Sequence, residues 1–318
     1  MTSPVDDSDW NRLLETRLRA PHELIDAIRN RKRRPLLGDD GHIFLLAVDH
    51  PARNTVAVHD NPLAMSDRRD LLERTIQALR HKRVDGVMAT PDILEELALL
   101  GALENKLAVG SINRGGLANS VWEMNDPITA ATPKSIIADG LDGGKVLLRI
   151  NESDANTLHT IKMVADVVSE MAEAGLPTII EPLPYHTVAK RQQLHKDDNA
   201  LIRAIGVASG LGSRSAYTWL KLPVWSKSTE VMTATSMPVV LLGGAPSNDL
   251  TADMQLWGQA LQSPQVRGYV IGRSLLYPKD NNVNKAVTAA AEILQHSILV
   301  KEKSNKTKND GLTDQGSK

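Results

Sequence analysis

The stretch HIFLLAVDH, residues 42 to 50, sets the pattern from which the fold can be predicted. It is a short apolar run that ends in two polar residues, Asp49 and His50. Seven further runs of this kind follow it: VDGVMAT (84–90), KLAVGSI (106–112), KVLLRIN (145–151), PTIIEPL (177–183), YTWLKLPV (217–224), MPVVLLGG (237–244) and RGYVIGRS (267–274). Near-continuous hydrophobic runs rich in β-branched residues are typical of strands buried on both faces of a parallel sheet.

Amphipathic segments separate these runs, as in SDRRDLLERTIQALRHK (66–82), where leucines and Ile76 form one stripe. Strands that recur about every 20 to 40 residues, eight times in all, predict an α/β fold, a single (β/α)8 TIM barrel over residues 42–299. An open doubly wound sheet is the main alternative, but an unbroken series of eight equivalent units favours closure. Residues 1–41 are expected to form an N-terminal helical extension divided at Pro21. The polar tail, 300–318, is expected to be disordered.

The composition excludes several classes of protein. The 318 residues are 42% hydrophobic and 24% charged, with a net charge of −1 and no cysteine. No run approaches the roughly 18 apolar residues of a membrane span, and the N-terminus lacks the order of a secretory signal. We therefore expect a cytoplasmic protein without disulfides or membrane partners. The one basic block, RNRKRR (29–34), is interpreted as a solvated helix end and not as a nucleic-acid site.

Charged residues fall near the carboxyl ends of the predicted strands, where barrel enzymes carry their chemistry. Because side chains alternate along a strand, each of these residues shares a face with inward-pointing neighbours. Five ionisable groups are therefore expected to converge inside the barrel: Asp49, Lys145, Arg149, Glu181 and Lys221. A single such residue is more often a structural ion pair, but burying five without a task would be costly.

Two lysines with an inward glutamate suit amine catalysis. A lysine is a nucleophile only when neutral, and apolar walls with a neighbouring ammonium group disfavour its charged form. Attack on a ketone also requires a carboxyl group to move protons. We therefore predict that Lys221 forms a Schiff base, Glu181 shuttles protons, Lys145 lowers the lysine pKa and orients the intermediate, and Asp49 is a second acid/base or hydroxyl-binding group.

The last two predicted strands end in glycines, which let backbone N–H groups approach an anion. Gly243 and Gly244 end the seventh strand, while Gly272 and Arg273 end the eighth. Barrels commonly bind phosphate at these two loops, so a phosphate site is predicted here. Asn113, in SINRGG after the third strand, is a further candidate substrate contact, although a role in forming the turn is equally compatible with this loop.

At these residues the chain resembles the class I aldolases of the (β/α)8 superfamily, which include deoxyribose-phosphate, fructose-bisphosphate and tagatose-1,6-bisphosphate aldolases. The resemblance covers residues 42–277 and is carried by AVDH (47–50), KVLLR (145–149), IIEPLPY (179–185), WLKLPV (219–224) and VIGR (270–273). It implies a Schiff-base lysine at Lys221, a catalytic glutamate at Glu181, a matching lysine at Lys145 and phosphate binding at Gly272 and Arg273. No cofactor is implied.

The chain also resembles an aldolase-like barrel group associated with inositol degradation, through DHPAR, TPDILEEL, NRGGLA, SAYTWLKLP and GRSLLYP. Three positions depart from the tagatose type: Gly243 replaces a serine, His50 a glutamine and Arg149 a tyrosine. The added cation Arg149 suggests a substrate with an extra anionic group, such as a carboxylate. The phosphorylated keto acid 2-deoxy-5-keto-gluconate 6-phosphate would fit, as would a ketose (bis)phosphate.

Other functions remain open at this point. The nine histidines are scattered without paired ligand spacing, which disfavours a metal-dependent aldolase, and His50 is interpreted as a packed or surface residue. A phosphosugar isomerase or epimerase would use Glu181 and Asp49 without a covalent amine. A non-catalytic barrel that binds a sugar phosphate and regulates another protein is the third reading. A homo-oligomer is expected, although core packing explains outer residues such as Trp257 as well.

Overall fold

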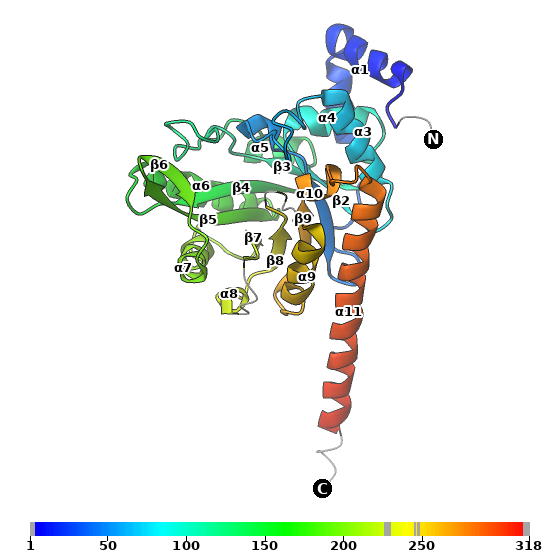
Figure 1. Ribbon diagram of the computed structural model, residues 1–318. Helices are drawn as coiled ribbons and strands as arrows, with labels where there is room; N and C mark the ends of the chain where they lie inside the picture. The colour runs from blue at the N-terminus through cyan, green and yellow to red at the C-terminus, as the bar shows by residue number, and fades with distance from the viewer. Residues whose placement is uncertain (1–3, 226–229, 245, 247–248, 314–318) are drawn as a thin grey trace.

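The computed structural model describes residues 4–225, 230–244, 246 and 249–313, with the side chains of 304–313 excepted. Eight parallel strands form one sheet in the order β4-β3-β2-β1-β9-β8-β7-β5, and the pairing of β4 with β5 closes it into a barrel (Figure 1). The predicted (β/α)8 barrel is confirmed. The strands are β1 (Ile43–Ala47), β2 (Gly86–Ala89), β3 (Leu107–Ser111), β4 (Gly143–Ile150), β5 (Thr178–Val188), β7 (Thr218–Leu222), β8 (Val239–Leu242) and β9 (Val266–Ile271).

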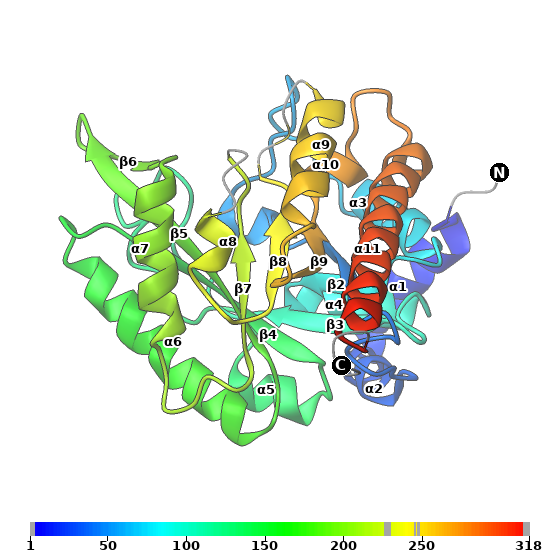
Figure 2. The same ribbon diagram turned by 90° about the horizontal axis from the view of Figure 1, so that it is seen from below.

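Helices surround this ring of strands, as Figure 2 shows for α6, α7, α9 and α11. Each buries an apolar stripe against the sheet, and several begin at an aspartate whose side chain accepts from the helix, as Asp67 does from the Asp70 N–H. The helices are α1 (Asp7–Arg19), α2 (His22–Asn30), η1 (Pro51–Arg53), α3 (Arg68–Leu79), α4 (Pro91–Leu99), α5 (Pro133–Ala138), α6 (Asn156–Glu173), α7 (Asp198–Ser209), α8 (Glu230–Thr233), α9 (Leu250–Ala260), α10 (Arg273–Leu276) and α11 (Val283–Thr313).

Two apolar layers follow from the alternation of strand residues. One cluster fills the barrel interior and includes Leu45, Ala47, Ile179 and Trp219, the residues expected on the inward faces. The other lies between strands and helices and includes Val146, Leu148 and Leu220, together with Trp257 of α9. Trp257 is buried and packs against Tyr269, so its size serves the core.

The basic block that follows α2 closes the amino-terminal end of the barrel. Arg31 and Arg33 both pair with Asp142, which precedes β4, at 2.6 and 2.9 Å. Arg34 pairs with Asp85, which precedes β2. These arginines are therefore not the solvated helix end that the sequence suggested. They bind carboxylates at the base of the barrel, and Leu36 packs against the interior cluster from the same end.

One strand was not expected from the sequence. β5 continues past the barrel wall to Val188 and pairs antiparallel with β6 (Arg191–Leu194). The turn between them places Ala189 and Lys190 at φ 48° and 64°. The sequence lacks the Asn-Gly or Asp-Gly signal that usually marks such a turn.

Both ends of the chain carry helix beyond the barrel. α1 and α2 precede β1 on either side of Pro21, and α2 packs against α4. α11 does not end at residue 300, where disorder was expected to begin, but continues to Thr313 (Figure 1). Residues 314–318 of the expected tail lie outside the described residues.

The base of the barrel gives a stability prediction. Arg31 is almost fully buried against Asp142, so Arg31→Met leaves a buried carboxylate with only the partly exposed Arg33 as a cationic partner. We expect a loss of about 3 kcal/mol in the free energy of unfolding, since removing one partner of a buried pair is costly. Urea unfolding followed by circular dichroism measures it. Arg19→Met, which removes an exposed pair with Glu15, is the matched control and should unfold like the parent. Equal midpoints for both variants would show that the base cluster is not stabilising.

Candidate active site

Three residues on adjacent strands meet inside the barrel near its carboxyl end. Glu181 Oε2 on β5 lies 2.6 Å from Lys145 Nζ on β4 and 3.2 Å from Lys221 Nζ on β7. All three side chains are buried. The structure thus brings together the two lysines and the glutamate that the sequence predicted.

The strand register explains the geometry of this cluster. Lys145 is paired with Ile179, which in turn is paired with Trp219. Glu181 and Lys221 each lie two residues further along their strands, so they share a level one layer above Lys145. Lys145 therefore reaches upward to the glutamate and is 1% exposed, whereas Lys221 is 5% exposed.

Asp49 extends the cluster toward β1 and β3. Its Oδ2 lies 3.7 Å from Lys145 Nζ and 2.8 Å from Arg114 Nη1, and it accepts a 2.6 Å hydrogen bond from Ser111 Oγ. Arg114 and Ser111 come from β3 and the residues just after it. The ion pair of Arg114 with Asp49 makes it part of the site.

Burial and charge act in opposite directions on these groups. Burial would raise the pKa of Glu181, but the charges of Lys145 and Lys221 outweigh it and hold that pKa well below its usual range. For Asp49 the charges of Arg114 and Lys145 likewise overcome burial and lower the pKa. Burial, assisted by Arg114, lowers the pKa of Lys145 to about 8 against the opposing charges of Glu181 and Asp49. The carboxylates are ionised at neutral pH, and the Lys145 ammonium group loses its proton more easily than that of a free lysine.

Arg149 points into the barrel as alternation predicted, but the loop after β3 encloses it, and Asn113 of that loop is buried as well. Arg149 is 1% exposed and donates to the Glu123 and Gly116 carbonyls at 2.6 and 2.8 Å. Asn113 continues the β3–β4 ladder, because its amide both donates to the Leu147 carbonyl and accepts from the Leu147 N–H, each at 2.7 Å. The substrate contacts expected of these two residues give way to contacts within the protein.

The predicted phosphate residues lie around the ends of β8 and β9. Arg273 donates to the Gly244 carbonyl at 3.3 Å, and its Nε is buried without a hydrogen-bond partner among the described residues. Gly244 has φ +66°, a conformation that favours glycine. A Cβ at Gly272 would meet the Ala47 carbonyl at 2.1 Å, and one at Gly243 would meet Ile271 Cγ2 at 2.7 Å. The glycines thus permit the close approach of strands and loops beside Arg273.

His50, interpreted from the sequence as a packed or surface residue, is partly buried and lies beside Gly272. β1 ends at Ala47 and His50 is the N-cap of η1, so strand alternation no longer applies to it. Its Cε1 is 2.7 Å from where a Cβ of Gly272 would lie. Burial and the charge of Arg273 lower the pKa of His50 to about 3, and its Nδ1 has no partner among the described residues. A neutral imidazole therefore lies beside Gly272 and near Arg273.

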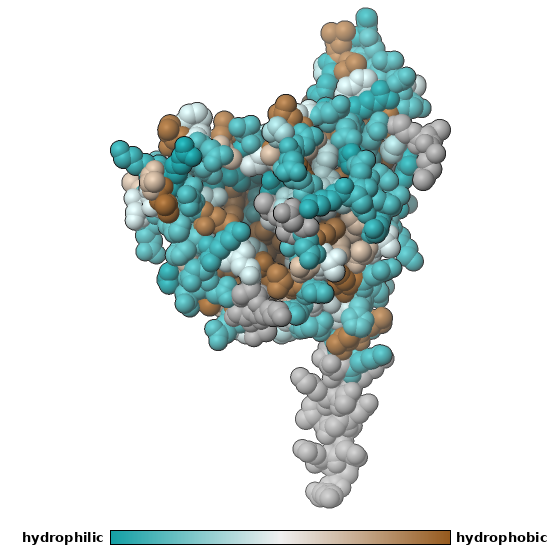
Figure 3. Space-filling view, in the orientation of Figure 1, coloured by the Kyte–Doolittle hydropathy of each residue, from teal (hydrophilic) through white to brown (hydrophobic). Residues whose placement is uncertain are grey.

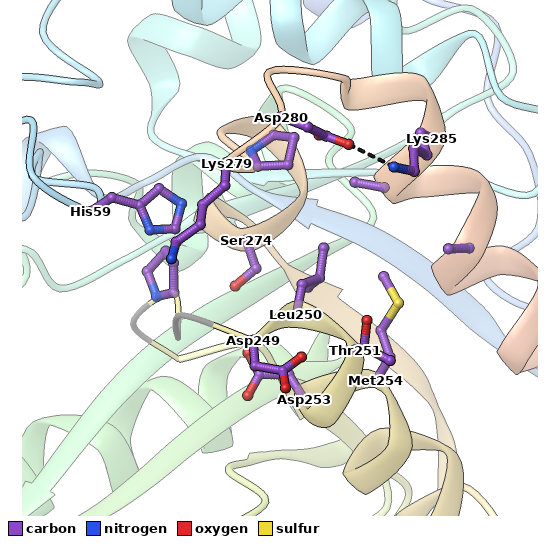
Figure 4. A pocket seen from close by; sticks show the side chains of 14 residues that line it. His59, Asp249, Leu250, Thr251, Asp253, Met254, Ser274, Lys279, Asp280 and Lys285 are labelled. Atoms are coloured by element: carbon purple, nitrogen blue, oxygen red, sulfur yellow. Dashed lines mark hydrogen bonds and ion pairs between the residues drawn. The ribbon is translucent and has the colours of Figure 1, made fainter.

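A separate cavity of about 360 Å³ lies outside the barrel (Figure 4). It is bounded by α9, by Ser274 of α10, by the loop that leads into α11 and by His59. The Asp280–Lys285 ion pair borders it. None of the residues of the lysine–glutamate cluster lines this cavity, which places the reactive groups in the barrel and not here.

The surface agrees with a chain that buries its apolar residues. The face in Figure 3 is largely hydrophilic, with hydrophobic residues near its middle and over α1. Within the described ranges, no helix combines the length and the apolar character that crossing a bilayer requires.

The fold and site together define a (β/α)8 barrel with a lysine–glutamate–lysine cluster at the carboxyl ends of its strands. Residues 41–291 match the model of the Cgl0159-like family. The crystal structure of Cgl0159 from Corynebacterium glutamicum (Brevibacterium flavum) is 42% identical, covers 92% of this chain and 98% of its own, and superposes with a TM-score of 0.89. The chain belongs to the Cgl0159-like family.

More distant structures share the fold. An archaeal fructose 1,6-bisphosphate aldolase is 15% identical and covers 85% of this chain and 98% of its own, with a TM-score of 0.61. A structure of the Schiff base forming fructose-1,6-bisphosphate aldolase, described for its reaction intermediates, has the same identity and TM-score and covers 99% of its own chain. A search among curated proteins found no significant match.

The electrostatics of the cluster give a prediction about Lys145. Glu181→Gln removes the nearest charge that favours the ammonium form, so the pKa of Lys145 should fall below its present value of about 8. The lysine amines can be followed by NMR titration of ¹⁵N-lysine-labelled protein, assigned with Lys145→Met. Glu173→Gln, on the exposed end of α6, is the control and should leave that titration unchanged. A pKa that stays the same or rises in Glu181→Gln would contradict the assigned balance of charges.

Proposed function

We propose that the protein is a class I aldolase that cleaves or forms a carbon–carbon bond through a Schiff base on Lys221. The observation that carries the proposal is that the ammonium groups of two lysines share one carboxylate oxygen of Glu181, inside a closed barrel. A buried amine beside a carboxylate has both the nucleophile and the proton carrier that condensation with a ketone requires.

The two lysines are not equivalent. Lys145 is held by Glu181 at 2.6 Å and by Asp49 at 3.7 Å, on the lower level of the barrel. Lys221 has one longer contact and lies on the upper level, nearer the open end. We therefore propose that Lys221 is the nucleophile. Lys145 is proposed to be the cation that stabilises the Glu181 carboxylate and the intermediate.

The proton steps follow from the starting charges. Glu181 is ionised and takes a proton from the Lys221 ammonium group, which leaves a neutral amine. The amine attacks the ketone carbon to form a carbinolamine, and the protonated Glu181 returns its proton to the departing hydroxyl group, so that water leaves and an iminium ion forms. Cleavage then requires a base for the substrate hydroxyl proton, and Asp49 or the ionised Glu181 can fill that role.

The proposed substrate is a phosphorylated keto sugar or keto acid. Gly243, Gly244, Gly272 and Arg273 are proposed to bind its phosphate, supported by the buried Nε of Arg273, which has no hydrogen-bond partner among the described residues. The distant structural relatives whose titles name fructose 1,6-bisphosphate support a ketose (bis)phosphate. The sequence resemblance to an inositol-degradation group supports 2-deoxy-5-keto-gluconate 6-phosphate as the alternative within the same chemistry.

Covalent trapping tests the proposal. Borohydride reduces an iminium ion to a stable amine, so the protein treated with dihydroxyacetone phosphate and borohydride should gain one adduct by intact mass spectrometry. Lys221→Met should show no adduct. Glu181→Gln should form it about 10² to 10⁴ times more slowly, the usual effect of losing a positioned acid/base. Lys162→Met, on the outer face of α6, is the control and should label like the parent.

The same variants separate the other functions. An isomerase that relies on Glu181 and Asp49 alone would retain turnover in Lys221→Met and acquire no adduct. A non-catalytic binder would show neither turnover nor adduct with any ketose phosphate or keto acid phosphate. Either result would remove the aldolase proposal.

We also propose a homo-oligomer. Leu14 and Leu18 of α1 are 47% and 72% exposed, one turn apart on the same helix face. If these leucines lie between subunits, a Leu14→Lys, Leu18→Lys double variant should have a lower molar mass than the parent by light scattering. An unchanged mass would show that α1 is not the interface.

A further inference from the structure

Two arginines at the mouth of the barrel have no carboxylate within ion-pair distance among the described residues. Arg53 belongs to η1 in the loop after β1, and Arg273 begins α10 after β9. Neither takes part in any of the ion pairs that the described residues form, whereas Arg114 and Arg149 both do. An arginine that is partly withdrawn from water without a counter-ion is unusual, because the guanidinium group stays charged.

The backbone holds Arg53 in place from both sides. Its N–H donates to the His50 carbonyl at 3.1 Å, and its own carbonyl accepts from the Ala118 N–H at 3.1 Å. Its side chain makes one long hydrogen bond, from Nε to the Gly116 carbonyl at 3.4 Å. The two Nη groups, which form the fork that binds carboxylates and phosphates, make no hydrogen bond or ion pair within the described part of the chain.

The acids near Arg53 are already engaged by other cations. Asp126 Oδ2 lies 3.3 Å and Glu123 Oε1 3.7 Å from Arg149. Asp49 pairs with Arg114 at 2.8 Å. The remaining neighbours include Glu181, which Lys145 and Lys221 share, and the Tyr185 ring beside Arg149. Each nearby carboxylate therefore has a closer partner than Arg53.

The position of Arg53 relative to the reactive groups is also informative. Burial lowers its pKa, as does the charge of Arg114, while Asp126, Tyr185 and Glu181 oppose this change. Arg53 thus lies within electrostatic reach of the proposed proton carrier. Arg273, whose pKa is lowered by burial and by Arg53 itself, donates to the Gly244 carbonyl after β8 and to the Ala57 carbonyl in the loop after β1. The Arg53 side chain instead contacts Gly116 in the loop after β3.

We propose that Arg53 binds a second anionic group of the substrate, at the end opposite to the phosphate held near Arg273. This inference rests on the proposed function and narrows its substrate class to molecules with two anionic ends. A single guanidinium fork matches a carboxylate in a bidentate way, whereas a second phosphate would normally find several donors. Arg53 therefore takes the role that the sequence suggested for Arg149, whose own guanidinium is enclosed by the loop after β3.

Binding of unreactive polyols tests Arg53 independently of the Schiff base. Glucitol 6-phosphate, 6-phosphogluconate and glucitol 1,6-bisphosphate share a six-carbon chain and differ at one end, which is a hydroxymethyl, a carboxylate or a phosphate group. Isothermal titration of the full-length protein should show 6-phosphogluconate binding at least about tenfold more tightly than glucitol 6-phosphate, the scale of one charge-assisted pair. Arg53→Met should reduce this ratio of affinities to about one without weakening the binding of glucitol 6-phosphate.

Further variants keep the result interpretable. Arg53→Lys retains the charge but loses the fork, and should keep an intermediate ratio. Arg273→Met should weaken all three ligands together. Arg214→Met, an exposed arginine ahead of β7 at the base of the barrel, should change nothing. Tighter binding of the bisphosphate than of 6-phosphogluconate would support Arg53 but identify its partner as a second phosphate.

The inference is overturned if the parent protein binds glucitol 6-phosphate as tightly as both two-ended ligands. It is also overturned if Arg53→Met and Arg53→Lys, shown to be folded by their unchanged melting temperature, preserve the preference. Neither outcome depends on trapping at Lys221. If the protein forms the borohydride adduct but does not prefer ligands with two anionic ends, the proposed function stands and only this inference fails.

Discussion

The site depends on one carboxylate oxygen that is shared by two buried ammonium groups. Glu181 Oε2 lies within 3.2 Å of both lysine Nζ atoms. The three charged groups are thus held close together inside the barrel, largely away from water. Each cation offsets the desolvation of the carboxylate, and the carboxylate in turn offsets the repulsion between the cations. Removing Glu181 would leave two buried ammonium groups without their shared counter-ion, so the surrounding barrel must keep all three strands in register.

Barrel closure is what provides that register. β5 and β7 pair directly, and β4 joins them because the sheet closes through the β4–β5 pairing. The apolar interior below the cluster, with Ile179 and Trp219, excludes water from beneath it. At the opposite end Arg31, Arg33 and Arg34 bind Asp142 and Asp85, so charge is concentrated at both ends of a hydrophobic interior. The cations at the base bind carboxylates of the protein, whereas chemistry and substrate binding are proposed for Lys221, Lys145, Arg53 and Arg273 at the mouth.

Much of this arrangement could be predicted from the sequence. The apolar runs located all eight barrel strands, and alternation placed Asp49, Lys145, Glu181 and Lys221 inside, because the period of two is set by backbone geometry alone. Alternation could not say which inward side chain meets substrate. Arg149 does point inward, but the loop after β3 folds over it, and Gly116 makes this approach possible because a Cβ there would lie 2.5 Å from Arg149 Nη1.

The residues and contacts that the sequence did not predict lie outside the strands, where the alternating pattern of the sequence no longer applies. His50 was placed by an alternation that stops at Ala47, and Arg53 belongs to a single turn of 3₁₀ helix with no periodic signal. The ion pairs of RNRKRR join residues about 50 to 110 positions apart, so no local pattern reveals them. The turn of the β5–β6 hairpin uses Ala189 and Lys190 at positive φ, where local preference would place glycine or asparagine.

The most direct test of the central claim is a crystal structure of the protein after reaction with dihydroxyacetone phosphate and borohydride. Our account predicts continuous density from Lys221 Nζ to the second carbon of the three-carbon unit, with the Glu181 carboxylate in hydrogen-bond reach and Lys145 unmodified beneath it. An adduct on Lys145, or the absence of any adduct on Lys221 in the parent protein, would contradict it.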